Sequence, residues 1–219
     1  KSYIEWPQWD YRRVKGLGKV KLNDIVVFNY PAGDTILTEE KYQANDYYAM
    51  VYSFGQQIYQ SQMPNPITPD SLSPQQQLDY FNMLYNIGRN YIVNNPNEYG
   101  SIDHRPTDRR ENYVKRCVGL PGQTLQIRNR IVASIRLNTD AATGEVYPLN
   151  AVTGWTRDNY GPIWIPKKGE TVQLTLKNIA LYERPIRVYE HNQLDIRNGK
   201  IYINGREAHS YTFKMDYYW

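Results

Sequence analysis

Short apolar or alternating runs, typical of strands, dominate both ends of the chain. Residues 24–28 (Asp-Ile-Val-Val-Phe) are β-branched and nearly all apolar, which predicts a strand buried on both faces. Residues 124–127 and 171–176 alternate with a period of two, as strands with one buried face do. Residues 112–118 and 211–219 are also expected to be extended. The pattern predicts a mainly β protein.

Turn residues sharpen this prediction in the second half of the chain. In residues 194–205, Asn198-Gly199 separates two alternating runs, and an Asn-Gly pair accepts the positive φ angles of a two-residue hairpin turn. Gly-Leu-Pro-Gly at residues 119–122 predicts a tight bend after the strand at 112–118. Residues 178–191 suggest a short helix interrupted at Pro185.

Residues 39–95 carry a helical pattern instead. A first helix is expected over residues 46–59, followed by a proline-rich break. Ser73 then supplies an N-cap, with Pro74 at the first helical position and Gln76 at the capping-box position. Apolar residues recur at three- and four-residue steps until an Asn-Asn-Pro sequence ends the second helix. We expect a helical hairpin that packs on its neighbours rather than a binding site.

Composition excludes several classes of function. The chain has 26 Lys and Arg against 22 Asp and Glu, a net charge of +4 that is too small to indicate nucleic-acid binding. The single cysteine cannot form an internal disulfide, and the 3 histidines lack metal-ligand spacing, so neither a metal nor a cofactor is expected. The 21 Tyr and 5 Trp suit sheet faces, interfaces and wet grooves. The sequence has no apolar stretch long enough to span a membrane.

Lys115 is the residue most suggestive of chemistry. Side chains alternate along a strand, so Lys115 shares a face with Tyr113 and Cys117, while Arg116 points the other way. If that face is covered, desolvation disfavours a charged ammonium and lets a lysine act as a general base. The other interpretation is an edge-strand lysine whose charge prevents aggregation, and residue type and position alone favour it.

A resemblance to a known family reverses that balance. Residues 112–122, Asn-Tyr-Val-Lys-Arg-Cys-Val-Gly-Leu-Pro-Gly, resemble the lysine box of bacterial type I signal peptidases. Residues 23–28 resemble the strand box that precedes it, with Asn-Asp in place of the usual Gly-Asp, and residues 198–205 are similar to the family's later hairpin. The three blocks follow the family's order. The region between the first two departs from the better-known members and resembles the elaborated Bacteroides-type form.

The resemblance implies a fold and a division of the chain. The fold is mainly β (the signal-peptidase and LexA-like β fold) with a helical insertion, and α+β overall. Residues 1–38 and 111–130 would form parts of the catalytic β core, and residues 39–110 the helical insertion. Residues 131–219 would form a second β-rich subdomain.

The resemblance also implies roles for individual residues. Family members use a serine nucleophile and a lysine general base, and the base would be Lys115, with Phe28 and Cys117 supporting its environment. An extended signal peptide would pair with the strand at 112–115, placing small side chains at its −1 and −3 positions in shallow pockets. The residues that would bind this substrate are Asn112, Tyr113 and Val114. Structural roles would fall to Arg116, Gly119, Pro121 and Gly122.

The family's nucleophile box, of the type Ser-Met-x-Pro-Thr, is not found before residue 23. Ser2 lacks the following residues of that box, and Ser61-Gln62-Met63-Pro64 has a misplaced methionine and follows the strand box. The family's closing Gly-Asp-Asn-Arg box would follow Trp219. We therefore expect a soluble fragment, inactive by itself. Its parent enzyme would lie in the inner membrane, held by an anchor outside the chain, with this region on the periplasmic side.

Two other functions fit some of the same features. The aromatic content suits a non-enzymatic β-rich binding or adhesion module, for which Trp6, Trp9, Trp155 and Trp164 would form one exposed, coplanar surface. A self-cleaving repressor would share the serine–lysine chemistry. Such a repressor needs a DNA-binding domain, and neither the charge balance nor any helix-turn-helix pattern indicates one. No nucleic-acid partner is expected.

Overall fold

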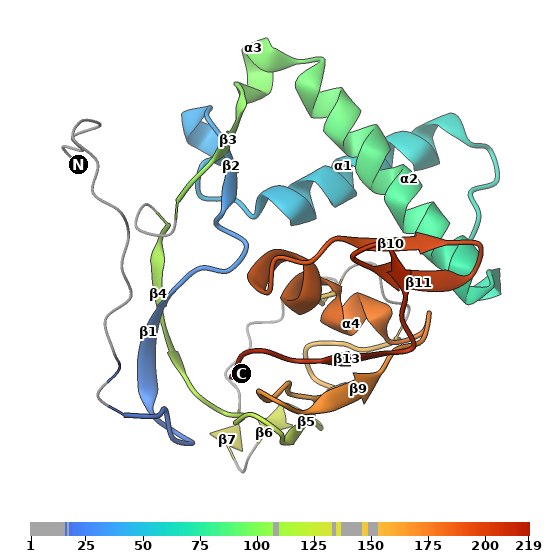
Figure 1. The fold of residues 1–219 in the computed structure, drawn as a ribbon. Coiled ribbons are helices and arrows are strands. Elements are labelled where there is room, and N and C mark those ends of the chain that lie inside the picture. Colours follow the sequence, from blue (N-terminus) through green and yellow to red (C-terminus); the bar gives the residue numbers. More distant parts are fainter. Residues whose placement is uncertain (1–15, 17, 107–109, 133–134, 137–145, 149–152) are drawn as a thin grey trace.

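The computed structural model describes residues 16, 18–106, 110–132, 135–136, 146–148 and 153–219 of the 219-residue chain. Short antiparallel strands and a few helices make up this part, which confirms an α+β fold with a large β component (Figure 1).

Strands between residues 25 and 116 form a β ribbon. Strand β1 (Ile25–Asn29) pairs antiparallel with β4 (Asn112–Arg116). Further along the same ribbon, β2 (Thr35–Leu37) pairs with β3 (Ile102–His104). The two pairings bring the ends of the helical segment 38–101 together, so the helices extend from the tip of the ribbon (Figure 1). The pattern of the sequence did not predict β2 or β3, since three residues are too few to show an alternation.

The expectation that β1 is buried on both faces is wrong. Ile25 and Val27 are 58% and 68% exposed, and Val114, opposite Val27, is 59% exposed. Where β1 pairs with β4, the described part of the ribbon consists of these two strands alone. No other described element covers the face that carries Ile25, Val27 and Val114. An apolar sequence favours burial, but the described residues supply no element that covers this face.

The predicted helical hairpin is present, with the N-cap expected for its second helix. Ser73 Oγ accepts the Gln76 N–H at 3.4 Å, and the Gln76 side chain accepts the Ser73 N–H at 3.0 Å, so the capping box is confirmed. The first helix is longer than expected because it continues for a turn toward the proline-rich connection. The elements are η1 (Glu40–Tyr42), α1 (Tyr47–Gln62), η2 (Pro69–Ser71), α2 (Pro74–Val93) and the short α3 (Pro96–Tyr99).

The two long helices touch through their backbones. A Cβ atom added at Gly55 of α1 would lie 1.9 Å from Leu84 O, and one added at Gly88 of α2 would lie 1.9 Å from Val51 O. Only glycine fits at either position. Buried clusters flank this crossing, one around Val51 and the other around Leu84.

The second half of the chain forms several small sheets. Asn198 and Gly199 have φ angles of 52° and 73°, which confirms the predicted hairpin turn. Helix α4 changes to a π-helical turn at Pro185, as the interruption there predicted. The final strand is shorter than the expected 211–219. The strands are β5 (Thr124–Ile127), β6 (Ile131–Val132), β7 (Ile135–Arg136), β8 (Tyr160–Trp164), β9 (Thr171–Gln173), β10 (Leu194–Arg197), β11 (Lys200–Ile203), β12 (Arg206–Glu207) and β13 (Ser210–Thr212), with helices α4 (Ile179–Arg184) and η4 (Pro185–Tyr189).

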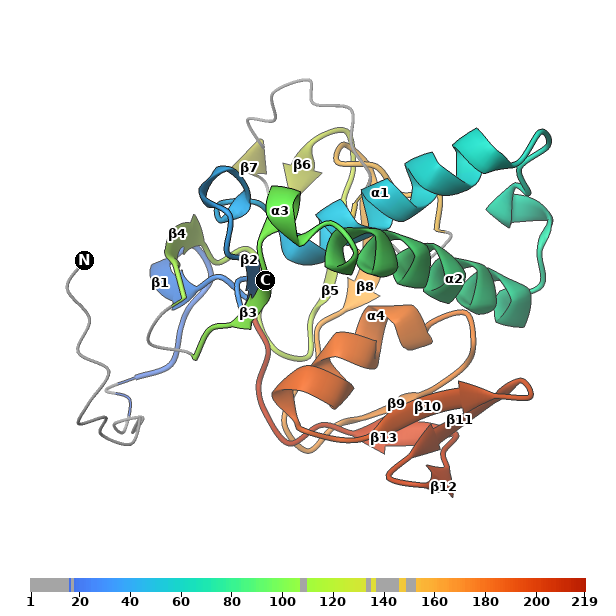
Figure 2. The same cartoon turned by 90° about the horizontal axis from the view of Figure 1, so that it is seen from above.

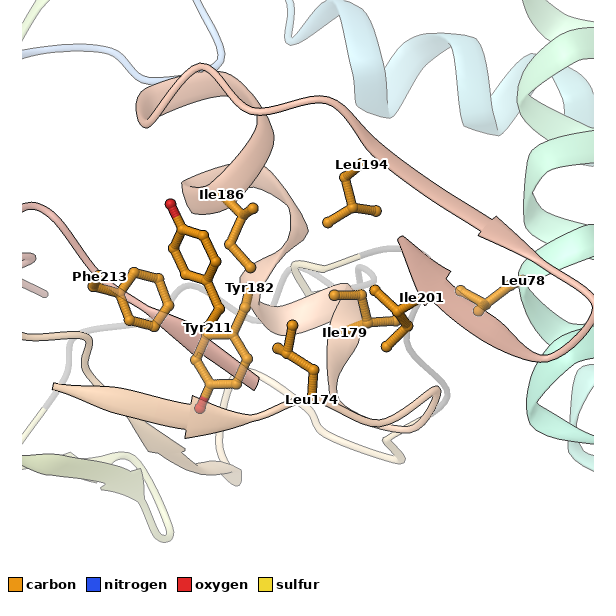
Figure 3. Packing of buried hydrophobic residues seen from close by; sticks show 9 residues of the cluster. All are labelled: Leu78, Leu174, Ile179, Tyr182, Ile186, Leu194, Ile201, Tyr211 and Phe213. Carbon is orange, nitrogen blue, oxygen red and sulfur yellow. The ribbon is translucent and has the colours of Figure 1, made fainter. Parts of the chain in front are cut away.

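A buried cluster holds this half together. Ile179 and Ile186 of the α4–η4 segment pack with Phe213, and all three are at most 1% exposed (Figure 3). Leu78 of α2 joins the same cluster, which fastens the helical hairpin to the C-terminal sheets. Figure 2 shows α4 between α2 and those sheets. The apolar area buried here is the main source of the stability of this part.

A buried carboxylate explains why the last strand ends early. Glu190 is 7% exposed and accepts hydrogen bonds from the Tyr211 hydroxyl at 2.6 Å and the Tyr217 hydroxyl at 3.2 Å. It also accepts the backbone N–H groups of Lys214 and Met215. These bonds replace those of a strand ladder and turn the chain away from β9 after residue 213.

Candidate functional site

Lys115 lies on β4, directly opposite Val26 of β1. Opposite residues in an antiparallel pair share a face, so Lys115, Tyr113 and Phe28 project to the same side of the ribbon. The Lys115 Nζ lies 5.8 Å from the centroid of the Tyr113 ring. The lysine side chain is exposed, and no described group forms a hydrogen bond with its Nζ.

The other residues of the lysine box lie around this position. Asn112 Oδ1 accepts a hydrogen bond from Asn29 Nδ2 at 3.0 Å. Arg116 points to the opposite face and donates from Nη1 to Asn23 O at 3.0 Å. Cys117 is 2% exposed, and its Sγ lies 3.4 Å from Gly119 O. The thiol is therefore enclosed beside the lysine strand.

The bend after β4 is tightly enclosed. Gly122 has a φ of 82°, and its N–H donates to Ile165 O at 2.8 Å. Pro121 lies within this bend. A Cβ atom at Gly119 would lie 2.3 Å from the Ile165 side chain, so a larger residue there would displace the packing beneath the bend.

Among the described residues, nothing pairs with the backbone groups at the outer edge of β4. Near one end of the ribbon, the Tyr30 N–H donates to Glu111 O at 2.8 Å. At the other end, the Cys117 N–H donates to Asp24 O at 2.8 Å. Bonding alternates along an antiparallel pair, so the odd-numbered residues of β4 direct their backbone groups to β1 and the even-numbered ones, including Val114, direct theirs outward. In the part of the chain that the structure describes, no strand pairs with this edge.

Just beyond β4 the same edge is occupied. The Val118 N–H donates to Trp219 O at 2.8 Å, and Trp219 donates its own N–H to Gly119 O at 3.0 Å. Backbone groups at this edge can therefore form hydrogen bonds with an extended chain, as those of Val118 and Gly119 do with Trp219.

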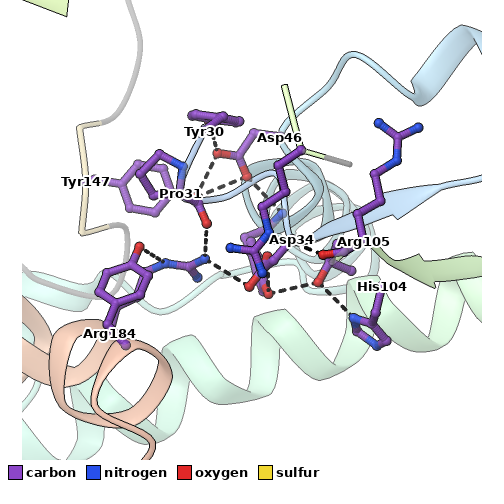
Figure 4. A network of polar contacts seen from close by, with 12 residues as sticks. Tyr30, Pro31, Asp34, Asp46, His104, Arg105, Tyr147 and Arg184 are labelled. Atoms are coloured by element: carbon purple, nitrogen blue, oxygen red, sulfur yellow. Dashed lines mark hydrogen bonds and ion pairs between the residues drawn. The ribbon is translucent and has the colours of Figure 1, made fainter. Parts of the chain in front are cut away.

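A polar cluster supports the ribbon from the side of the helical hairpin. The Tyr30 ring stacks on Tyr113, with centroids 4.6 Å apart and planes 19° from parallel. The Tyr30 hydroxyl donates to Asp46 Oδ2 at 2.6 Å, and the Tyr147 hydroxyl donates to the same carboxylate at 3.2 Å (Figure 4). Burial, followed by the hydrogen bond to Asp46, raises the pKa of Tyr30 above its usual range, which keeps its hydroxyl a donor.

Arg184 ties the C-terminal half to this cluster. Its Nη2 donates to Pro31 O at 2.7 Å and lies 3.3 Å from Asp34 Oδ2, in the turn between β1 and β2 (Figure 4). Its Nε donates to the Tyr189 hydroxyl at 2.9 Å, and its guanidinium lies 4.8 Å from the centroid of the Tyr48 ring. One side chain thus joins α4, the ribbon and the start of α1.

Replacing Arg184 by alanine is expected to lower the free energy of unfolding by about 2 kcal/mol, the usual range for hydrogen bonds of a charged group. The Arg184 side chain is only 28% exposed, so its partners would remain partly buried without it. Arg187→Ala is the matched control, because that side chain is 61% exposed and contacts Glu183 at 3.4 Å. The control should change stability by less than about 0.5 kcal/mol. Equal losses in urea titrations of the two variants would contradict the role of Arg184.

A pocket of about 360 Å³ lies elsewhere, between the helical hairpin and residues near Trp155. It is lined by Tyr52 and Gln56 of α1, by the proline-rich connection and by Trp155, and by no residue of β1 or β4. The Trp155 ring packs on Tyr160 at 4.6 Å, and Trp164 packs on Phe213 at 5.9 Å. These two tryptophans face different clusters, unlike the coplanar surface of an adhesion module. Trp6 and Trp9 are outside the described residues.

The described residues contain neither a cluster of three or more histidine, cysteine or acidic side chains that could bind a metal nor a helix long and apolar enough to cross a membrane.

A lysine on β4, beside a strand edge that no described strand pairs with, is an arrangement suited to a peptidase that binds its substrate as a strand. Comparison with protein families defines the class further: the model described as "Signal peptidase, peptidase S26" matches residues 3–148. The chain belongs to this signal peptidase family. Its members are serine peptidases with signal peptides as substrates, and the family is membrane-associated. Neither the curated proteins nor the solved structures include a match.

Family membership favours the peptidase over the binding module and the repressor. The match includes the strand box, the helical segment and the lysine box. The sequence pattern indicates the lysine box but gives no signal for Tyr30, Asp46 or Tyr147, which support it. The sequence predicts Asp46 only as the start of a helix, since a carboxylate at that position gives no local signal that it also binds distant hydroxyls.

Proposed function

We propose that this chain is the soluble, periplasm-facing part of a Bacteroides-type type I signal peptidase, with Lys115 as the general base of a serine–lysine pair. The observation that carries the proposal is the position of Lys115, on β4 beside a strand edge that is unpaired among the described residues and within the segment that matches the family. The family's serine box is absent from residues 1–219, and we place the nucleophile outside them.

The reaction assigns two proton transfers to Lys115. The neutral amine takes the proton of the serine hydroxyl as its oxygen attacks the scissile carbonyl carbon. The resulting ammonium then gives this proton to the leaving amine, which leaves an acyl-enzyme for water to hydrolyse. Because the lysine side chain is exposed among the described residues, we propose that the serine segment and the bound peptide cover it. Phe28, Tyr113 and Cys117 form the wall beside it.

The substrate is proposed to add a strand to the outer edge of β4. The outward backbone groups of Asn112 and Val114 would bond the peptide, and Tyr113 would stand beside the catalytic amine. The Val114 side chain projects to the other face, where it is 59% exposed and is available to a small substrate side chain. Arg116 and the bend from Gly119 through Pro121 to Gly122 would hold this strand in place.

The proposed division of the chain follows the ribbon. Residues 1–38 and 111–130 would be parts of the catalytic core, residues 39–110 the insertion and residues 131–219 the second subdomain. The pairing of β2 with β3 is compatible with an insertion that begins and ends at the ribbon. The membrane anchor is placed outside the chain, with this region on the periplasmic side.

The proposal is tested with a preprotein peptide that carries alanine at −1 and −3. The 219-residue chain is expected to cleave no bond, because it lacks the attacking hydroxyl, whereas the full-length enzyme should cleave after the −1 residue. Products are identified by mass spectrometry. If the 219-residue chain cleaves the peptide and its Lys115→Ala variant does not, the proposal that the nucleophile lies outside residues 1–219 is refuted.

A further inference from the structure

We infer that the helical insertion positions the proposed catalytic amine: Asp46, the N-cap residue of α1, acts as a positioning residue for Lys115 through Tyr30 and Tyr113. The inference rests on the proposed function of Lys115 and adds a role for a region to which the family match assigns none. The three contacts in this relay join the start of the insertion to β4.

The first contact is the hydrogen bond of Asp46. Its Oδ1 accepts the backbone N–H groups of Tyr48 and Ala49 at 3.0 and 3.1 Å, which fixes the carboxylate at the start of α1. Its Oδ2 accepts the Tyr30 hydroxyl at 2.6 Å, the short distance typical of a charge-assisted bond (Figure 4). The Tyr30 ring is therefore held at both ends, by its backbone in the ribbon and by its hydroxyl on the helix.

The second contact is the stack of Tyr30 on Tyr113. The rings are 4.6 Å apart and nearly parallel, so Tyr30 limits the rotation of Tyr113 about its side-chain bonds. Tyr113 has one face on Tyr30 and lies on the same side of β4 as Lys115. Fixing Tyr30 thus fixes the ring next to the amine.

The third contact is between Tyr113 and Lys115. The Nζ is 5.8 Å from the ring centroid, and no described residue offers it a hydrogen bond. A long, exposed lysine side chain has many rotamers, and a fixed ring beside it reduces their number. General-base catalysis requires the amine within hydrogen-bond reach of the hydroxyl, so a loosened ring lowers the fraction of productive geometries.

Tyr147 provides a matched control. Its hydroxyl binds the same carboxylate at 3.2 Å, and burial together with the charge of Asp46 raises its pKa above the usual range, as for Tyr30. The described contacts include a ring stack on Tyr113 for Tyr30 and none for Tyr147. Removing either hydroxyl therefore takes one hydroxyl donor from Asp46, and only the removal at Tyr30 releases a ring stacked on Tyr113.

The experiment measures kcat, KM and the thermal midpoint of Tyr30→Phe and Tyr147→Phe in the full-length enzyme. Tyr30→Phe should lower kcat about tenfold with KM unchanged, as expected for lost geometry at the reacting atoms. Tyr147→Phe should keep kcat within about twofold. Asp46→Ser preserves the helix cap but is too short to reach the Tyr30 hydroxyl, so it should match Tyr30→Phe. Asp46→Asn keeps an oxygen for the cap, and its Nδ2 can donate to the Tyr30 hydroxyl oxygen, so it retains a hydrogen bond in the reversed direction and should retain most of kcat.

Equal falls in kcat for Tyr30→Phe and Tyr147→Phe would overturn the inference, since they would reflect a general structural role of Asp46. Wild-type kcat in Tyr30→Phe would overturn it as well. If Lys115→Ala is inactive in the same assay, either of these results contradicts only the positioning role of Asp46 and leaves the proposed function of Lys115 intact. An active Lys115→Ala enzyme would refute the proposed function together with the inference.

Discussion

Replacing Lys115 by alanine in the full-length enzyme is expected to lower kcat for preprotein cleavage by a factor of about 10⁴ or more, as removal of one member of a nucleophile–base pair does. Lys115→Arg should be equally inactive, because a guanidinium stays protonated at any pH of the assay and cannot accept the serine proton. The fold should be preserved in both variants, since the Lys115 side chain is exposed and its Nζ forms no described hydrogen bond.

Lys200 supplies the control for this experiment. It is also an exposed lysine on a strand, where it pairs with Glu207 at 2.8 Å. Lys200→Ala should retain wild-type cleavage, because an exposed ion pair contributes little to stability and lies outside the lysine box. Cleavage is followed with purified enzyme in detergent, and circular dichroism checks the fold. Near-wild-type processing by either Lys115 variant would remove this residue from the mechanism.

Replacing Gly88 by alanine is expected to lower the free energy of unfolding by about 3 kcal/mol, the upper part of the usual range for overpacking. The added Cβ would lie 1.9 Å from Val51 O, and a backbone atom cannot rotate away as a side chain can. Gly55→Ala should have a similar effect, because its Cβ would lie 1.9 Å from Leu84 O. Either change forces α1 and α2 apart and opens the clusters on both sides of the crossing.

Helix propensity makes the opposite prediction, which gives the test its strength. Alanine in place of glycine in the interior of a helix should add about 1 kcal/mol when nothing opposes it. Asn86→Ala, at an exposed position of α2, serves as the control and should be neutral or slightly stabilising. Urea unfolding of the three variants is the measurement. A gain in stability for Gly55→Ala and Gly88→Ala would show that the helices are not in backbone contact.

Local elements were readable from the sequence because their signals are local. The capping box of Ser73 and Gln76 and the Asn198-Gly199 turn each satisfy backbone groups within a few residues. Pro185 changed the helix at the expected residue because it removes a backbone donor. The strand box and the lysine box lie within residues 3–148, which match the family, and both are readable from short runs of residues.

The support of the candidate site was not readable in the same way. Asp46 and Tyr30 are 16 residues apart, and Tyr147 is 101 residues from Asp46. No spacing pattern in the sequence predicts contacts between residues so far apart. Gly55 and Gly88 stand out in the sequence as helix-weakening residues, and only their mutual approach explains them.

The sequence by itself determined the types of the main elements, their caps and turns, and the lysine box that identifies the family. Tertiary structure alone decided the exposure of β1, the backbone contact of α1 with α2, and the contacts that join Asp46 to Tyr113 through Tyr30. The physical reason is that caps, turns and alternation depend on bonds within a few residues. Burial, stacking and shared hydrogen bonds depend on distances between segments that only the folded chain brings together.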